Sequence, residues 1–178
     1  MTVESIEVRQ VEVRDPAAEP LLRDLHLEYH SRYGPNEELS RYADEEFSPP
    51  DGAFLILVED GETVAGGAFR RHDQTTAELK RIWTHPAHRR RGLGLVVVRE
   101  LEREAVRRGY RRIHLTTGPR QPEAARLYLA AGYRPLFDLD ADPETIGPLP
   151  FEKLLEGPAP CETAASGYDV RAAEVQEA

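Results

Sequence analysis

The run Arg89-Arg90-Arg91-Gly92-Leu93-Gly94, with the apolar stretch Leu95-Val96-Val97-Val98 behind it, most constrains how this chain can fold. It predicts a glycine-bearing loop that opens an α-helix. Gly92 and Gly94 have no Cβ atom, so the backbone can come close to a ligand there. The unpaired amides of the first helical turn, the helix dipole and the adjacent arginines all favour an anion. The run therefore predicts a phosphate site at the start of a helix.

Two widespread phosphate loops do not fit this run. The Walker loop needs Gly-Lys-Ser/Thr after its second glycine, where this chain has Leu93-Gly94-Leu95. The dinucleotide fingerprint needs a further glycine where this chain has Val97. What remains is the pattern Arg89-x-x-Gly92-x-Gly94.

Composition indicates an ordinary globular protein. A length of 178 residues with 40% apolar residues suits a single domain with a substantial core. No apolar run approaches the roughly 18 residues of a membrane span, and the start Met1-Thr2-Val3-Glu4 has no signal-peptide features. The lone Cys161 excludes an internal disulfide and a cysteine-built metal site. We therefore expect a cytoplasmic protein with one domain over residues 1–156 and a flexible C-terminal tail over residues 157–178.

Charge is unevenly distributed. The net charge is −9, yet basic side chains gather between Arg70 and Arg126, around the glycine loop. Such a patch could bind nucleic acid, but it has little aromatic interleaving and no nucleic-acid motif. A polyphosphate cofactor fits the patch better, and we expect no nucleic-acid and no membrane partner.

Hydrophobic patterning predicts eleven elements in the order β-α-α-β-β-β-α-β-α-β-β. The crossover through the helix after the glycine loop makes the strands before and after it parallel. Gly66-Gly67 suggests a bulge or a close backbone approach within its strand. The expected ranges are strand 6–13, helices 16–33 and 36–46, strands 53–58, 63–70 and 77–84, helix 93–108, strand 112–117, helix 123–131, and strands 133–139 and 151–155.

Several segments together resemble one known family, the GNAT N-acetyltransferases. The stretch Ala77 to Pro86, followed by Arg89-x-x-Gly92-x-Gly94, is similar to the family's fourth strand and cofactor loop. The family's fifth strand and following helix are resembled by Leu115-Thr116-Thr117-Gly118, Gln121-Pro122-Glu123-Ala124 and Leu127-Tyr128-x-x-x-Gly132-Tyr133. The resemblance implies a mixed α/β fold, a mostly antiparallel twisted sheet of about seven strands flanked by about four helices. It also implies transfer of an acetyl group from the cosubstrate acetyl-CoA to an amine.

The resemblance also implies which residues bind acetyl-CoA. The fourth strand would hold the pantetheine and acetyl groups through Ile82, Trp83 and Thr84. Many family members have an asparagine at the place of Gln121, so this contact departs from the family pattern. The cofactor-binding residues implied are Ile82, Trp83, Thr84, Arg89, Arg90, Arg91, Gly92, Leu93, Gly94, Leu95, Gln121, Ala124 and Tyr128.

Two side chains match the family's catalytic positions. Glu78 would be the general base, with loss of the proton to solvent water as the alternative. Tyr128 would be the general acid that protonates the departing thiolate. The backbone N–H of Ile82 would stabilise the oxyanion. An inert thiol is the simpler interpretation of Cys161, so direct attack in a ternary complex is preferred over a ping-pong scheme.

We expect no metal site. His26 and His30 are four residues apart, a spacing that can bind metal, but the local pattern offers no third ligand. His85 and His88 precede the phosphate loop and would only shape it.

The acceptor is predicted from charge. In this family it enters between the first two helices and near the loop before the last strand, and both regions are acidic here. These residues would attract a small cationic amine or a basic peptide terminus. The alternative is that they are ordinary solvated surface charge. The residues concerned are Glu37, Glu38, Asp44, Glu45, Glu46, Asp51, Asp138, Asp140, Asp142 and Glu144.

Two other functions stay open on the sequence alone. One is a non-catalytic acyl-CoA-binding sensor of the same fold, and the other is a basic-patch nucleic-acid binder. The presence of both Glu78 and Tyr128 favours the enzyme. Members of the family are often dimers, but nothing in the sequence selects a dimer surface.

Overall fold

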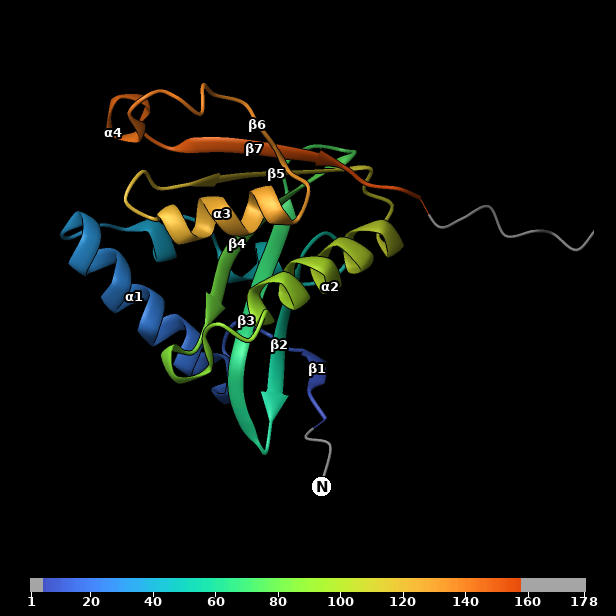
Figure 1. Ribbon diagram of the computed structural model, residues 1–178. Helices are drawn as coiled ribbons and strands as arrows, with labels where there is room; N and C mark the ends of the chain where they lie inside the picture. Colours follow the sequence, from blue (N-terminus) through green and yellow to red (C-terminus); the bar gives the residue numbers. More distant parts are fainter. Residues whose placement is uncertain (1–4, 158–178) are drawn as a thin grey trace, which may run out of the picture.

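One sheet of seven strands runs through the described part of the protein, residues 5–157 of the computed structural model (Figure 1). The spatial order is β1-β2-β3-β4-β5-β7-β6. Only β4 and β5 pair in parallel, as the crossover through a helix predicted. The strands are β1 (Glu7–Gln10), β2 (Ala53–Glu59), β3 (Glu62–Arg71), β4 (Thr76–Thr84), β5 (Arg112–Thr117), β6 (Arg134–Pro135) and β7 (Leu149–Leu154).

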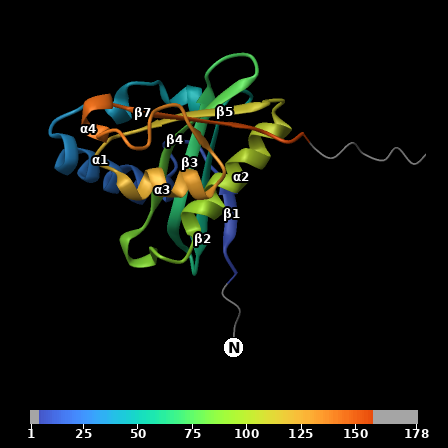
Figure 2. The same cartoon turned by 45° about the horizontal axis from the view of Figure 1, so that its top comes forward.

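Helices cover both faces of this sheet. The α-helices are α1 (Glu19–Tyr33), α2 (Leu93–Arg107), α3 (Pro122–Ala130) and α4 (Pro143–Ile146). In both views α3 lies next to α2 (Figures 1 and 2). Asp15 caps the turn before α1, where its carboxylate accepts a hydrogen bond from the backbone N–H of Ala17 at 2.8 Å.

The sheet separates two hydrophobic cores, and β2 shows why. Its continuous apolar run alternates between faces, so Leu55 and Leu57 pack with α2 while Phe54 and Ile56 pack with α1. The amphipathic α2 buries Val97, Val98 and Leu101 against the first face. The mixed α/β fold with a mostly antiparallel sheet is therefore confirmed.

Two predicted elements were wrong. The helix expected over residues 36–46 is two 3₁₀ turns, Glu38–Ser40 and Asp44–Phe47. The strand expected over residues 133–139 is reduced to β6, because Pro135 has no N–H and the chain leaves the ladder after the Leu136 N–H bonds the Pro150 carbonyl. The fourth helix is instead α4, which Asp142 caps within the acidic loop.

The strands β4 and β5 form the opening that positions the site. They pair only from Thr76 to Glu78, and no ladder joins them beyond that point. On its other edge β4 carries a bulge, because Gly66 opposes Trp83 while Ala68 opposes Lys80. At the bulge Arg81, with a φ of 61°, and Ile82 together oppose the single residue Gly67. The bulge is thus on β4 and not within the strand of Gly66-Gly67. The alternative, a close approach, is confirmed, because a Cβ atom on Gly67 would lie 2.5 Å from the side chain of Ile82.

Some expectations lie beyond what the structure describes. Cys161 and nearly all of the expected tail fall in residues 158–178, outside the described residues. Within residues 5–157, no helix is long and apolar enough to cross a membrane. The same residues contain no group of three or more metal-binding side chains arranged to hold an ion.

Candidate active site between strands 4 and 5

A cavity of about 540 Å³ lies where the glycine loop, the end of β4 and α3 meet. It contains nearly all of the residues that the sequence assigned to a cofactor. Arg91 is the exception. The lining residues are Glu28, Ile82, Trp83, Thr84, Arg89, Arg90, Gly92, Leu93, Gly94, Leu95, Gln121, Glu123, Ala124, Arg126, Leu127 and Tyr128.

The start of α2 leaves its amides available to a ligand. Gly92 is the N-cap residue with a φ of 75°, and no side chain caps the helix. The first N–H groups of an α-helix have no partner within it. A Cβ atom on Gly94 would lie 3.2 Å from the side chain of Leu127, so this glycine allows α3 to approach closely. The loop thus has the geometry expected for an anion site.

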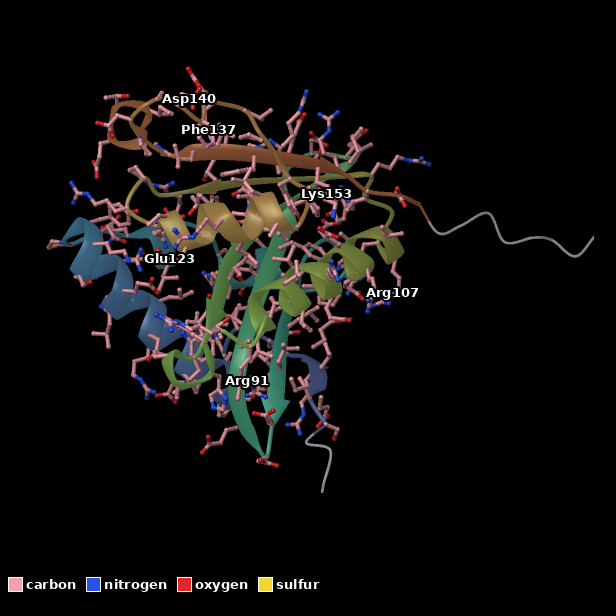
Figure 3. The ribbon with its side chains drawn as sticks, viewed as in Figure 1. Arg91, Arg107, Glu123, Phe137, Asp140 and Lys153 are labelled. Carbon is pink, nitrogen blue, oxygen red and sulfur yellow. The ribbon has the colours of Figure 1, made fainter. Side chains whose placement is uncertain are left out.

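The arginines of this loop point to different partners. Arg91 forms two hydrogen bonds with the carboxylate of Glu59, at 2.8 and 2.6 Å, at the end of β2. Figure 3 shows Arg91 beside β2 and β3, on the far side of the loop from α3. These hydrogen bonds lower the pKa of Glu59. Arg91 therefore anchors the loop to the sheet, while Arg89 and Arg90 line the cavity.

A second cavity, of about 520 Å³, adjoins the first. The two share Ile82, Gln121, Ala124 and Tyr128, so they meet at these residues. The rest of the second lining comes from α1, the segment after it, β4, the β5–α3 loop and the residues around α4. These are Tyr29, Tyr33, Asn36, Glu37, Glu38, Arg41, Leu79, Lys80, Arg81, Thr116, Thr117, Gly118, Pro119, Arg120, Glu144, Gly147 and Pro148.

Known proteins with this architecture identify the family. A model described as Acetyltransferase (GNAT) family matches residues 19–133. The chain belongs to the GNAT acetyltransferase family. It is therefore an acyltransferase enzyme, as the family resemblance implied.

Individual relatives agree with this assignment. The chain is 29% identical over 126 residues to Uncharacterized N-acetyltransferase YsnE of Bacillus subtilis (strain 168), covering 68% of this chain and 83% of that protein. Its fold is similar to that of a putative acyl-CoA N-acyltransferase from Klebsiella pneumoniae, with a TM-score of 0.67, 24% identity, and coverage of 85% and 98%. It is also similar to the PaiA N-acetyltransferase of Thermoplasma acidophilum in complex with coenzyme A, with a TM-score of 0.65, 19% identity, and coverage of 84% and 99%.

Tyr128 is placed at the junction of the two cavities of this GNAT chain. Its ring packs against Tyr133 and Phe151, and the residue is buried. Burial, with a smaller contribution from Tyr29, raises the pKa of the Tyr128 phenol. Tyr128 therefore keeps its proton in neutral solution and can act as a hydrogen-bond donor.

Gln121 reaches the same junction from the β5–α3 loop. Its Oε1 accepts a hydrogen bond from the backbone N–H of Gly118 at 3.2 Å. This bond holds the side-chain amide across the start of α3. The longer side chain that replaces the family's asparagine is thereby fixed at the shared edge of the cavities.

Glu78 lies outside both cavities. Its carboxylate contacts Arg70 at 3.5 Å, His72 at 3.2 Å and Lys80 at 3.1 Å, and the residue is 7% exposed. Lys80 in turn contacts Glu38 at 3.0 Å, and both line the second cavity. Burial would lower the pKa of Lys80, but Glu78 and Glu38 outweigh it and raise the pKa. Glu78 thus connects to the cavity through Lys80, and its role as the base stays a prediction.

Only some of the acidic residues that were predicted near the acceptor line a cavity. Of the acidic residues predicted there, Glu37, Glu38 and Glu144 line the second cavity. Others are engaged elsewhere: Glu46 pairs with Arg70, and Asp51 pairs with Arg71. The second cavity is also lined by basic residues, namely Arg41, Lys80, Arg81 and Arg120.

Several lining residues were missed by sequence reasoning. Glu28, Tyr29 and Tyr33 come from the last turns of α1, where their spacing of one and four residues places them on adjacent faces of a helix. Arg126 comes from α3, one position before the recognised Leu127-Tyr128 pair. The helical spacing could have found the tyrosines. No local pattern indicates which surface arginine faces a cavity.

Proposed function

We propose that this protein transfers the acetyl group of acetyl-CoA to a primary amine by direct attack while both substrates are bound. The single observation that carries the proposal is that two cavities of similar size meet at Ile82, Gln121, Ala124 and Tyr128. One cavity has the expected phosphate loop, and the other opens between α1, β5 and α4. Two substrates that enter from the two sides would meet at this junction.

Acetyl-CoA occupies the first cavity in this proposal. Its diphosphate accepts hydrogen bonds from the amides of Arg90 to Leu95 at the start of α2. Its pantetheine arm follows Ile82, Trp83 and Thr84, on the edge of β4 that β5 no longer pairs. The coenzyme A named in the related PaiA structure supports this choice of cosubstrate.

The chemistry needs three groups. The amine nitrogen attacks the thioester carbon, and the growing charge on the carbonyl oxygen is stabilised by the backbone N–H of Ile82 at the bulge. The carbon–sulfur bond then breaks, and the Tyr128 hydroxyl gives its proton to the thiolate. The ammonium loses one proton to water in the second cavity before its nitrogen attacks. A second N–H proton leaves after the addition and returns to the Tyr128 phenolate. Glu78, which lines neither cavity, can take the first proton through the water.

The acceptor in this proposal is a small primary amine. The second cavity combines carboxylates that can bind an ammonium group with several arginines and Lys80. Attraction of a cationic amine therefore depends on Glu37, Glu38 and Glu144. Of these described residues, Glu38 is paired with Lys80 and Arg41, and Glu144 is paired with Arg120. Rates with amines of different charge at two salt concentrations test this, because steering by charge weakens as salt is added.

A panel of amines, amino acids and peptides with acetyl-CoA tests the function directly. Free thiol and the mass of the acetylated product are measured for the unchanged protein and for Tyr128→Phe. We expect thiol release with at least one amine and a product heavier by one acetyl group. Binding of acetyl-CoA with no acceptor-dependent thiol release would contradict the proposal.

A further inference from the structure

Three arginines of the first cavity form no ion pair with a carboxylate among the described residues. Arg89, Arg90 and Arg126 line it, and none of them has a carboxylate within 4 Å among residues 5–157. Most arginines in the described part of the chain do have such a partner. Of the six arginines without such a partner in residues 5–157, three line this one cavity.

The acidic residues of the same lining do not compensate this charge. Glu28 and Glu123 are both bound by Arg32 of α1, the first at 2.8 Å. Figure 3 shows Glu123 on the side of α3 that faces α1. Burial would raise the pKa of Glu123, but the hydrogen bond from Arg32 outweighs it and lowers the pKa. Both carboxylates are thus paired with Arg32, and Glu123 also interacts with the charge of Arg89. Arg90 and Arg126 remain for a ligand.

The diphosphate is not the only anionic group that these three arginines can bind. Arg89 and Arg90 belong to the loop whose amides hold the diphosphate in the proposed function. Arg126 comes from α3, a different element of the same lining. Along α3 the lining changes from buried Tyr128 to exposed Arg126, so the cavity runs from an enclosed junction to an open rim.

We propose that Arg126 binds the 3′-phosphate of the coenzyme's ribose and makes this enzyme selective for coenzyme A over its dephosphorylated form. This inference rests on the proposed function, since it takes acetyl-CoA as the occupant of the first cavity. A phosphate monoester carries about −1.5 to −2 charges at pH 7 and three acceptor oxygens, which the forked guanidinium donors match. With the thioester at Tyr128 and the diphosphate at the α2 amides, the 3′-phosphate is the remaining anion at the open rim.

Calorimetry with four ligand and protein combinations tests the inference. Coenzyme A and dephospho-coenzyme A are each titrated into the unchanged protein and into Arg126→Gln. We expect the unchanged protein to bind coenzyme A about tenfold more tightly, as one charge-assisted contact at an accessible site provides. Arg126→Gln should lose most of that preference and leave the affinity for dephospho-coenzyme A unchanged. Added salt should reduce the ratio of the two affinities, coenzyme A over dephospho-coenzyme A, in the unchanged protein.

Arg99→Gln is the matched control, because Arg99 is exposed on α2, has no carboxylate within 4 Å in the described residues and lies outside this cavity. It should keep the full preference for coenzyme A. Equal weakening of both ligands by Arg126→Gln would mean that Arg126 contacts the diphosphate, and would overturn the inference. Equal affinities in the unchanged protein would overturn it too. Both of these results would leave the proposed function unaffected. The proposed function fails if the protein binds no coenzyme A and no dephospho-coenzyme A.

Discussion

Replacing Gly118 by alanine should deform the loop that joins the two cavities. A Cβ atom at this position would lie 1.9 Å from the hydroxyl oxygen of Tyr33 and 2.5 Å from its ring. Real Cβ atoms do not tolerate such distances, so Tyr33 or the loop must move. The Tyr33 hydroxyl also accepts a hydrogen bond from the backbone N–H of Arg120 at 3.1 Å, and movement breaks it.

The size of the effect follows from these contacts. Overpacking of a fitted site costs about 1–3 kcal/mol, and a lost hydrogen bond costs about 1 kcal/mol. We expect Gly118→Ala to lower the free energy of unfolding by about 2 kcal/mol, which corresponds to a fall in Tm of roughly 4–8 °C for a chain of this size. Because the Gly118 amide holds Gln121, kcat/KM for acetyl-CoA should fall as well.

Thermal unfolding and steady-state kinetics measure both effects, and a double-mutant cycle isolates the cause. In a Tyr33→Ala background, Gly118→Ala should cost much less, because the clashing ring is absent. Gly157→Ala is the control, since nothing lies within 4 Å of a Cβ atom there. An unchanged Tm for Gly118→Ala, or an equal cost in both backgrounds, would refute the steric argument.

Three further variants test the site. Tyr128→Phe should lower kcat about 10²-fold or more as a lost general acid, and since the pKa of Tyr128 is raised, the unchanged enzyme should lose no activity to its ionisation between pH 8 and 10. Glu78→Gln should lower Tm, and it should reduce kcat less than Tyr128→Phe does. If Glu78→Gln instead removed the acidic limb of the pH–rate profile, Glu78 would be the base. Glu59→Gln should raise KM for acetyl-CoA several-fold without changing kcat, because it releases Arg91. Because the pKa of Glu59 is lowered in the folded protein, its contribution to stability is present above the unfolded pKa of about 4.3. That contribution is lost as pH falls through the folded pKa. The Tm values of Glu59→Gln and the unchanged protein should therefore converge in acid.

Local patterns were sufficient where one signal dominated. Three signals each predicted the observed element: the continuous apolar run of β2, the helical spacing of Val97, Val98 and Leu101, and the glycine loop. Local patterns gave the wrong element where contacts with distant residues determine the backbone conformation. The residues after Asn36 form short turns because β4 fixes them: Lys80 bonds Glu38, and Arg81 donates to the Leu39 carbonyl at 2.9 Å.

The candidate site shows the same division. Most residues implied by the family resemblance line one cavity, because they belong to contiguous segments whose spacing fixes their geometry. The arginines do not follow this rule. Three consecutive residues were assigned to the phosphate site, yet Arg91 turns to Glu59 while Arg126 of another helix lines the cavity. The orientation of Arg91 away from the cavity depends on Glu59, which is far from the loop in sequence.

Initial rates with acetyl-CoA and the best amine of the panel varied together test the central claim most directly. The claim is that both substrates are bound at once and meet at Ile82 and Tyr128. Reciprocal plots should give lines that intersect, because a ternary complex forms before any product leaves. Parallel lines, with an acetylated protein detected by mass before the amine is added, would contradict it.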